Sequence, residues 1–260
     1  MSIQKPANNF ELLLHVAEDP CRFLGRRSYP LFESFLFGYG CNLPAGAGFQ
    51  ELPASGFEEF VRRRYPAPER WPYHLSVTCY VHFLGLDEAS AFDLYVQLRR
   101  DYFAAHPPVL LEPRLSEGSS LEQMLEAIRK RPKMYFTRTP DLMACLVAFL
   151  NGVVEAEHVH SGVSPTAALL EKFQAWMNAR CPWSLARPWD RILQFQNLWD
   201  PERSLTAFWT CFDLFRDGEP PDALTPVAQS MFNTNPDLAG MTEAERKAWK
   251  QQLKQIFYTE

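Results

Sequence analysis

An internal repeat constrains the fold of this chain more than any other feature of its sequence. The stretch that begins at Phe57 recurs from Phe173, 116 residues later, and the two copies align without a gap as far as Asp101 and Asp217. Prolines and aromatic residues share positions: Pro66 and Pro182, Pro72 and Pro188, Phe60 and Trp176, Phe92 and Phe208. Self-similarity at a fixed offset indicates one structural module that is present twice.

The upstream parts of the two copies also match, with a small shift. Segment 12–24 resembles segment 123–136, and segment 31–39 resembles segment 145–153. The matching positions are Pro20 and Pro132, Phe23 and Tyr135, Phe35 and Phe149, Leu36 and Leu150, and Gly38 and Gly152. The features follow one another in the same order in both halves, so the repeat covers most of each half.

Apolar residues at helical spacing predict that each copy is built from helices. In the second copy, Leu142, Leu146, Phe149 and Val153 recur at intervals of three and four residues, which places them on one face of a helix. The expected helices are 10–17, 29–41, 56–64 and 87–103 in the first copy, and 121–129, 140–157, 166–179 and 201–216 in the second. Proline-containing turns separate them.

One pair of segments gives conflicting signals. Residues 73–83 alternate between apolar and polar, which favours a strand, whereas residues 189–199 carry apolar residues at helical spacing. Homologous halves are expected to share one conformation, and we favour helix for both segments. The predicted fold class is therefore all-α. The alternative is an α+β fold with short strands at 73–83 and 189–199.

The repeat also predicts how the chain is divided. The expected parts are module 1 (1–105), a proline-containing linker (106–119), module 2 (120–217), and a proline-rich segment with a C-terminal helix (218–260). Thr242 and Glu245 fit a capping box at the start of that last helix. The two modules are expected to pack as a pseudo-symmetric pair.

Composition narrows the classes of function. The net charge of -5 and a pI of about 5.7 disfavour a general nucleic-acid binder. No stretch approaches the roughly 18 apolar residues that a membrane span needs, and the N-terminus lacks a signal-peptide pattern. The six cysteines are scattered without a CxxC pair, which favours free thiols in a reducing compartment. A cytoplasmic protein that does not bind membranes is expected.

Searches for chemistry return weak candidates. Glycine-rich phosphate loops and nucleophile elbows are absent, so neither a cofactor nor an enzyme activity is predicted. Glu155, Glu157, His158 and His160 could suit zinc or manganese, but metal ligands need convergent geometry, and a solvated helix end is the favoured interpretation.

Two tryptophans offer a different kind of candidate. Trp71 and Trp183 fall in proline-rich loops, where an exposed indole could anchor a protein partner. The alternative is that these loop aromatics cover the edges of helical cores.

A family resemblance comes from the second copy. Its matching residues are Ile128, Arg131, Pro132, Met134 and Tyr135. They fit an I-x-x-R-P-x-M-Y-x-G-like signature, which an FLNGY-like helix follows. The stretch resembles a recurring bacterial module, and some proteins with it resemble immunity proteins of polymorphic or type VI secreted toxins. Thr137 stands where the signature has Gly, and the first copy lacks the Arg and the Met-Tyr pair.

The resemblance implies an immunity protein that binds and neutralises a cognate secreted toxin. Its expected partner-binding residues are Trp71, Trp183, Glu155, Glu157, His158 and His160. The signature itself is interpreted as a packing device, in which Pro132 ends a helix, Arg131 bonds helix-end carbonyls, and Met134 and Tyr135 turn back onto the core. The alternatives are a helical adaptor or chaperone for a secreted effector and a metal-dependent enzyme centred on 155–160.

Overall fold

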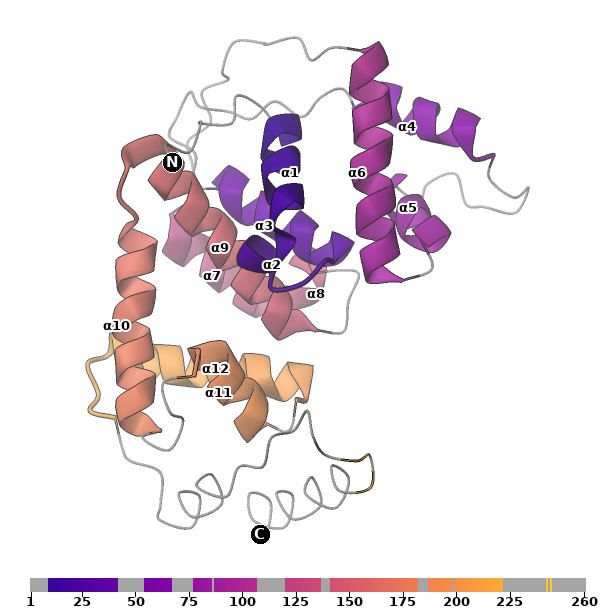
Figure 1. Cartoon of the computed structure of the whole chain (residues 1–260). Helices are drawn as coiled ribbons and strands as arrows, with labels where there is room; N and C mark the ends of the chain where they lie inside the picture. Colours follow the sequence, from indigo (N-terminus) through magenta and orange to yellow (C-terminus); the bar gives the residue numbers. More distant parts are fainter. Residues whose placement is uncertain are drawn as a thin grey trace. The chain divides into compact units, whose positions relative to one another are not determined.

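The fold was obtained as a computed structural model, and in the part of the chain that it describes, helices joined by turns and short connections are its regular secondary structure (Figure 1). The described residues are 9–41, 54–66, 77–85, 87–106, 120–136, 141–181, 187–197, 199–221, 242 and 244. No strand occurs among them. The predicted all-α class is confirmed, and in the two segments for which strands were the alternative, residues 77–83 lie in α5 and residues 189–196 lie in α11.

Each copy of the repeat contributes six helices to the described part of the chain. The first copy forms α1 (Asn9–Glu18), α2 (Pro20–Leu24), α3 (Tyr29–Cys41), α4 (Ala54–Arg64), α5 (Val77–Gly85) and α6 (Glu88–Ala105). The second forms α7 (Leu121–Lys130), α8 (Pro132–Tyr135), α9 (Leu142–Ser161), α10 (Pro165–Arg180), α11 (Trp189–Gln196) and α12 (Pro201–Arg216). The helices follow in matching order, while a pseudo-symmetric pairing of the modules stays a prediction.

Polar caps fix where the last helix of each copy begins. The Asp87 carboxylate accepts a hydrogen bond from the Ser90 amide at 2.9 Å, and Asp200 accepts one from the Arg203 amide at 2.8 Å. Each cap satisfies an amide that has no partner within the helix. Both start positions agree with the sequence-based prediction.

The chain divides into two compact units whose boundary lies inside the second predicted module. Unit 1 comprises residues 1–139 and 144–165, and unit 2 comprises residues 140–143 and 166–260. The division therefore falls at the start of α10 and not at the expected linker, of which the described residues include only His106. The physical reason is that α8 and α9 contact α3 of the first copy, through Tyr135 on Phe37 and through the glycines Gly38 and Gly152.

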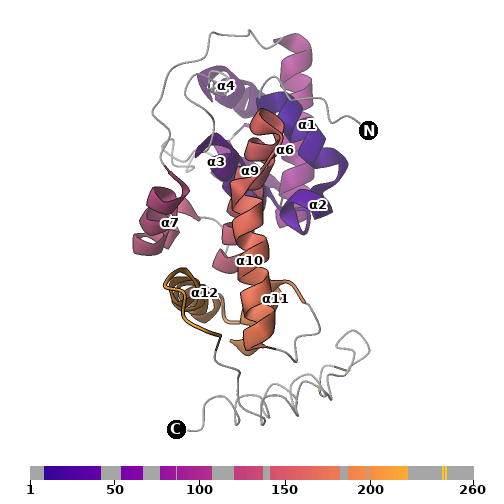
Figure 2. The same cartoon turned by 90° about the vertical axis from the view of Figure 1, so that its left-hand side faces the viewer.

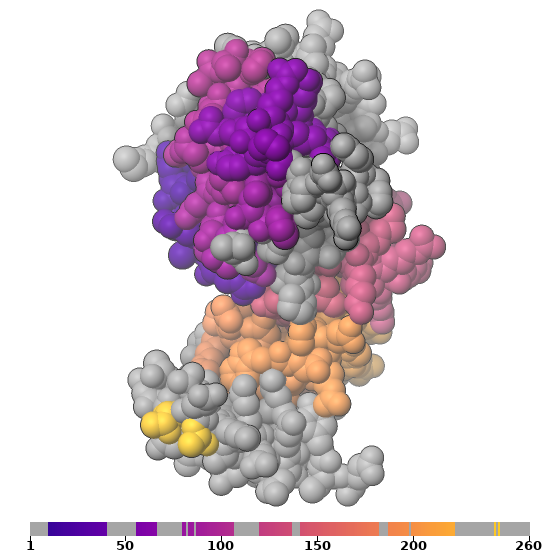
Figure 3. Space-filling view, turned by 90° about the vertical axis from the view of Figure 1, so that its right-hand side faces the viewer, coloured from indigo at the N-terminus to yellow at the C-terminus, as the bar shows by residue number. Residues whose placement is uncertain are grey.

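Unit 1 is organised around α6, against which α1, α3, α4 and α5 pack. Aromatic pairs make these contacts, including Phe10 with Phe103 at 4.3 Å, Phe32 with Phe92 at 5.8 Å, and Phe57 with Tyr102 at 5.5 Å between ring centroids. The purple and magenta residues of α4, α5 and α6 lie together on the face shown in Figure 3. Each buried ring removes a large apolar area from water, which stabilises the packing of these short helices.

Helices α3 and α9 cross at a pair of glycines within unit 1. A Cβ added to Gly38 would overlap the main-chain oxygen of Phe149, and one added to Gly152 would overlap the main-chain oxygen of Phe35. The contact is reciprocal, because the two glycines and the two phenylalanines are equivalent positions of the repeat. Glycine is required on both helices because only a hydrogen side chain lets the two backbones approach this closely.

Helix α9 is the longest helix in the described chain, with 20 residues. By length and apolar composition it could cross a membrane, but 61% of its apolar window is buried inside the protein. Leu146, Phe149 and Val153, which the helical spacing placed on one face, are at most 1% exposed. The helix thus has the burial of a core helix.

In the described part of the chain, unit 2 contains α10, α11 and α12 (Figure 2), and the ring of Phe173 contacts aromatic residues of both other helices. The Phe173 ring contacts Trp189 at 5.6 Å, Phe208 at 5.8 Å and Phe212 at 5.4 Å, all as centroid distances. These residues come from all three helices, so one aromatic cluster holds the unit together. The predicted C-terminal helix lies outside the described residues except for Thr242 and Ala244.

Candidate binding site

Four of the six predicted partner-binding residues belong to the described part of the chain, and these four do not share one environment. Trp71 and Trp183 lie outside the described residues. The other four lie on the last turns of α9, where their environments differ sharply. Glu155 is buried at 8% exposure, Glu157 and His160 are half-buried, and His158 is exposed.

Glu155 belongs to a buried polar cluster in unit 1. Its Oε1 lies 3.8 Å from the His15 Nε2 of α1, and the His15 ring packs against Phe23 at 5.0 Å. Burial, together with the nearby Glu155 charge, raises the pKa of Tyr39 far above its usual range. Tyr39 therefore remains a neutral phenol at physiological pH. Because Glu155 is buried, it is not available to a partner, which corrects its prediction as a partner-binding residue.

The remaining three residues do not form a metal site with Glu155. Glu157 Oε2 accepts a hydrogen bond from the Ser164 hydroxyl at 2.5 Å, whereas the His160 ring faces Tyr39 at 6.1 Å. Among the described residues, no group of three potential ligands converges on a common point. The metal-dependent enzyme centred on 155–160 therefore lacks the ligand geometry on which it depended.

The position of Met134 corrects one part of the interpretation of the RPxMY signature as a packing device. Ile128 is fully buried, but Met134 is 63% exposed and does not turn back onto the core. Arg131 is also exposed. Tyr135 is half-buried and stacks on Phe37 at 5.3 Å. Pro132 ends α7 as predicted and opens the short helix α8.

The segment 129–133 is also strongly basic, which the sequence analysis did not use. Four of its five residues are Arg or Lys in a chain of net charge -5. Lys130 pairs with Glu126 at 3.6 Å within the same helix, while Arg131 and Lys133 flank the proline and are exposed. Charge counted over a short window would have revealed this cluster. We call Arg131, Lys133 and Met134 the α8 surface.

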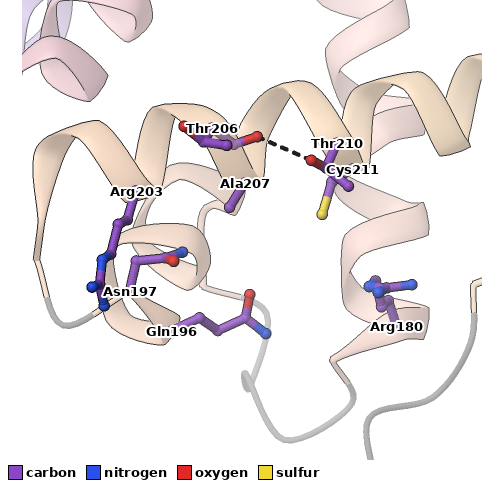
Figure 4. A pocket seen from close by; sticks show the side chains of 8 residues that line it. All are labelled: Arg180, Gln196, Asn197, Arg203, Thr206, Ala207, Thr210 and Cys211. Atoms are coloured by element: carbon purple, nitrogen blue, oxygen red, sulfur yellow. Dashed lines mark hydrogen bonds between the residues drawn. The ribbon is translucent and has the colours of Figure 1, made fainter. Parts of the chain in front are cut away.

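A separate pocket lies within unit 2, between α11, α12 and the end of α10 (Figure 4). Its volume is about 480 Å³, within the range of small-molecule sites. The lining residues are Arg180, Gln196, Asn197, Arg203, Thr206, Ala207, Thr210 and Cys211. Figure 4 shows Arg203 and Asn197 at one end and Arg180 at the other, with Gln196 between them.

Hydrogen bonds decide which polar groups face the pocket. The hydroxyls of Thr206 and Thr210 donate to main-chain oxygens one turn earlier in α12, so these residues offer mainly their methyl groups. Gln196 and Asn197 each use one amide hydrogen, toward Cys181 Sγ and the Leu193 oxygen respectively. An amide nitrogen carries two hydrogens, so both side chains retain a donor.

Charge in the pocket is positive at Arg180. This half-buried side chain lies 5.5 Å from the centre of the Trp176 ring and forms no ion pair with a carboxylate in the described part of the chain. Burial raises the pKa of the Cys211 thiol, and it raises the pKa of Cys181 to about 12. Both thiols are therefore neutral at physiological pH and do not compensate the guanidinium charge.

Comparisons of the chain with protein-family models, with curated proteins and with solved structures give no match. The two candidate sites, the α8 surface and the pocket of unit 2, are therefore interpreted from their own geometry.

Proposed function

We propose that this chain is an immunity-type protein that binds a cognate secreted bacterial toxin and thereby neutralises it. The observation that supports the proposal best is the exposure of Met134, at 63%, on the α8 surface. Methionine and arginine are enriched at protein interfaces relative to the rest of protein surfaces. A large apolar side chain between cations has the composition of an interface anchor with a charged rim.

The α8 surface is held in place by its neighbours, which favours recognition over flexibility. Pro132 fixes the start of α8, and the Tyr135 ring on the next residue after Met134 stacks on Phe37 of α3. Since a pre-organised anchor loses little conformational entropy on binding, more of its contact energy appears as affinity. The cations Arg131 and Lys133 predict an acidic patch on the toxin.

The test uses the product of the neighbouring gene as the candidate toxin. We expect it to inhibit growth when expressed alone in a heterologous host, and to be harmless and co-purify when this chain is present. Met134→Glu should weaken the complex by at least about tenfold. It removes the apolar contact of Met134 and places a carboxylate against the acidic patch that is expected on the toxin. Arg131→Glu should mainly slow association, with a steep dependence on salt.

A matched control is Val163→Glu, at another exposed apolar residue of unit 1, which is 67% exposed. That variant should keep the affinity of the parent protein. Equal affinity of the Met134→Glu and Val163→Glu variants would refute the α8 surface as the interface. A neighbouring product that is neither toxic nor bound would refute the immunity function itself.

A further inference from the structure

The pocket of unit 2 lies where the two copies of the repeat differ in side-chain size. At the offset of 116 residues, Tyr80 corresponds to Gln196, Leu94 to Thr210, and Tyr95 to Cys211. Tyr80 and Tyr95 are buried in unit 1, at 2% and 6% exposure. Larger side chains thus occupy the positions that in unit 2 surround an opening of about 480 Å³.

Hydrogen bonding supports this correspondence. The Tyr80 hydroxyl donates to the main-chain oxygen of Tyr65 at 2.7 Å, and Gln196 donates to the Sγ of Cys181 at 3.3 Å. Tyr65 and Cys181 are also equivalent positions of the repeat. Equivalent residues are therefore hydrogen-bonded in both copies, and smaller side chains stand beside the opening in unit 2.

The charge pattern differs at the same place. In unit 1, Arg64 forms an ion pair with Asp101 at 3.4 Å. The equivalent residues in unit 2 are Arg180 and Asp217, which form no ion pair with each other in the described structure. Arg180 lines the pocket instead, so its guanidinium is free to pair with an anion that enters it.

From these differences we infer that the pocket of unit 2 is a binding site for a carboxylate carried on an apolar body, with Arg180 as the group that pairs with the carboxylate. The apolar body would lie along α12, against Ala207, the Thr206 and Thr210 methyl groups and Cys211. Guanidinium and carboxylate match in shape and can form two parallel hydrogen bonds. The inference does not depend on the α8 surface.

A carboxylate fits the pocket better than a phosphate. A phosphate carries up to two charges and is normally bound by several cations or by clustered main-chain amides. Here the two arginines lie at opposite ends of the pocket, so one anionic group meets one guanidinium (Figure 4). The α12 wall between them presents methyl groups, which favours an apolar extension of the ligand.

Two probes represent the two sources of such a group. Phenylacetate represents a free carboxylic acid, and N-acetyl-alanyl-phenylalanine represents the C-terminal carboxylate of a polypeptide. The amides of both compounds have nearly the same shape but no charge, and inorganic phosphate tests for a general anion site. Binding is measured on the full chain by titration calorimetry, and the more tightly bound acid identifies the source.

We expect at least one acid to bind saturably and its amide to bind about tenfold more weakly or worse, since a charge-assisted hydrogen bond is lost. Arg180→Gln should reduce the affinity by a similar factor. Thr210→Leu, which installs the residue of the first copy, should reduce it by narrowing the pocket. Arg187→Gln, at an exposed arginine of unit 2 outside the pocket lining, should leave it unchanged.

Three results would overturn the inference: no saturable binding of either acid at millimolar concentration, phosphate binding as tight as that of the acids, or undiminished affinity in the Arg180→Gln variant. Circular dichroism of each variant establishes whether it is folded. Should Arg180→Gln not fold, Thr210→Leu decides, because its hydroxyl donates only within α12 and the residue is exposed.

Discussion

The helix triplets α4–α6 and α10–α12 are formed by equivalent segments of the sequence repeat, and both are built around a buried phenylalanine. Phe57 and Phe173 occupy their centres, and each stacks on the aromatic residue three positions later, at 6.5 Å on Phe60 and at 6.2 Å on Trp176. Around this shared centre the two versions diverge. Unit 1 fills the surrounding space with Tyr95, whereas the equivalent position in unit 2 is Cys211 beside an open pocket.

The difference shows that the helices and the site depend on separate sets of residues. Matching rings at the centre keep the triplet together in both units. Side chains on the neighbouring turns differ, with cysteine and glutamine in unit 2 where unit 1 has tyrosine, and the pocket of unit 2 lies at these positions. A cavity of this kind is tolerated where it performs a function that offsets its cost in stability.

The largest expected effect comes from removing the shared centre. Phe173→Ala and Phe57→Ala should each lower the free energy of unfolding by about 3–5 kcal/mol, because both rings are at most 1% exposed. Denaturant titration of each variant measures the loss. Val163→Ala serves as the surface control and should stay within about 0.5 kcal/mol of the parent. If only one of the two variants loses little free energy of unfolding, Phe57 and Phe173 do not have equivalent roles in the two triplets.

Much of the fold could be predicted from the sequence, because the relevant signals are local. Apolar residues at helical spacing predicted α6 and α12, and the helical pattern of 189–199 favoured helix for the equivalent segment 73–83, of which residues 77–83 lie in α5. The unit boundary could not be predicted, because it depends on which faces of α7–α9 pack against the first copy. That choice is made by long-range contacts such as the Gly38 and Gly152 crossing.

The candidate sites were harder to predict than the fold. Glu155 was expected at a surface because glutamate is usually exposed, yet it lies buried beside His15. Met134 was expected in the core because methionine is usually buried, yet it is exposed. The pocket lacks a motif altogether. It becomes visible in sequence only as a loss of side-chain volume between copies, at positions such as Cys211.

The second prediction addresses the reciprocal crossing of α3 and α9. Gly38→Ala and Gly152→Ala should each destabilise the protein by about 1–3 kcal/mol, because the new methyl group would overlap main-chain atoms of the opposite helix. Gly40→Ala is the matched control on α3, since its Cβ would meet nothing within 4 Å. It should be neutral or stabilising by up to about 1 kcal/mol. If Gly38→Ala and Gly152→Ala lose unequal amounts of stability, the two glycines do not contribute equally to the helix crossing.

The third prediction concerns alkaline pH and belongs to unit 2, where a buried thiol stands in place of Tyr65. Burial raises the pKa of Cys181 from 9.0 to about 12, so the folded state keeps a proton that the unfolded state releases. The resulting stability is fully present below pH 9 and is lost as pH rises toward 12, by up to about 1.4 kcal/mol per pH unit. Unfolding followed at several pH values should show a shallower decline for Cys181→Ala, whereas Cys21→Ala, at an exposed thiol, should retain the slope of the parent.

The smallest expected effect concerns position 99, where unit 1 has an arginine and the equivalent position 215 of unit 2 has a phenylalanine. The Arg99 guanidinium lies 3.8 Å from the centre of the Phe57 ring and its Nε donates to the Tyr95 hydroxyl at 2.9 Å. Phe215, the equivalent residue in unit 2, contacts Phe173 at 5.4 Å. Arg99→Ala should cost about 1 kcal/mol, since both the cation–π contact and the hydrogen bond are lost.

Arg99→Phe sharpens this comparison, because it gives unit 1 the ring that unit 2 already uses. The new ring would restore apolar contact with Phe57 but would leave the Tyr95 hydroxyl without its donor, so we expect it to recover about half of the loss measured for Arg99→Ala. Denaturant midpoints of the three proteins decide the matter. If Arg99→Phe is less stable than Arg99→Ala, Tyr95 leaves no space for a second ring beside Phe57. The core of unit 1 would then not accept the aromatic residue that unit 2 has at the equivalent position.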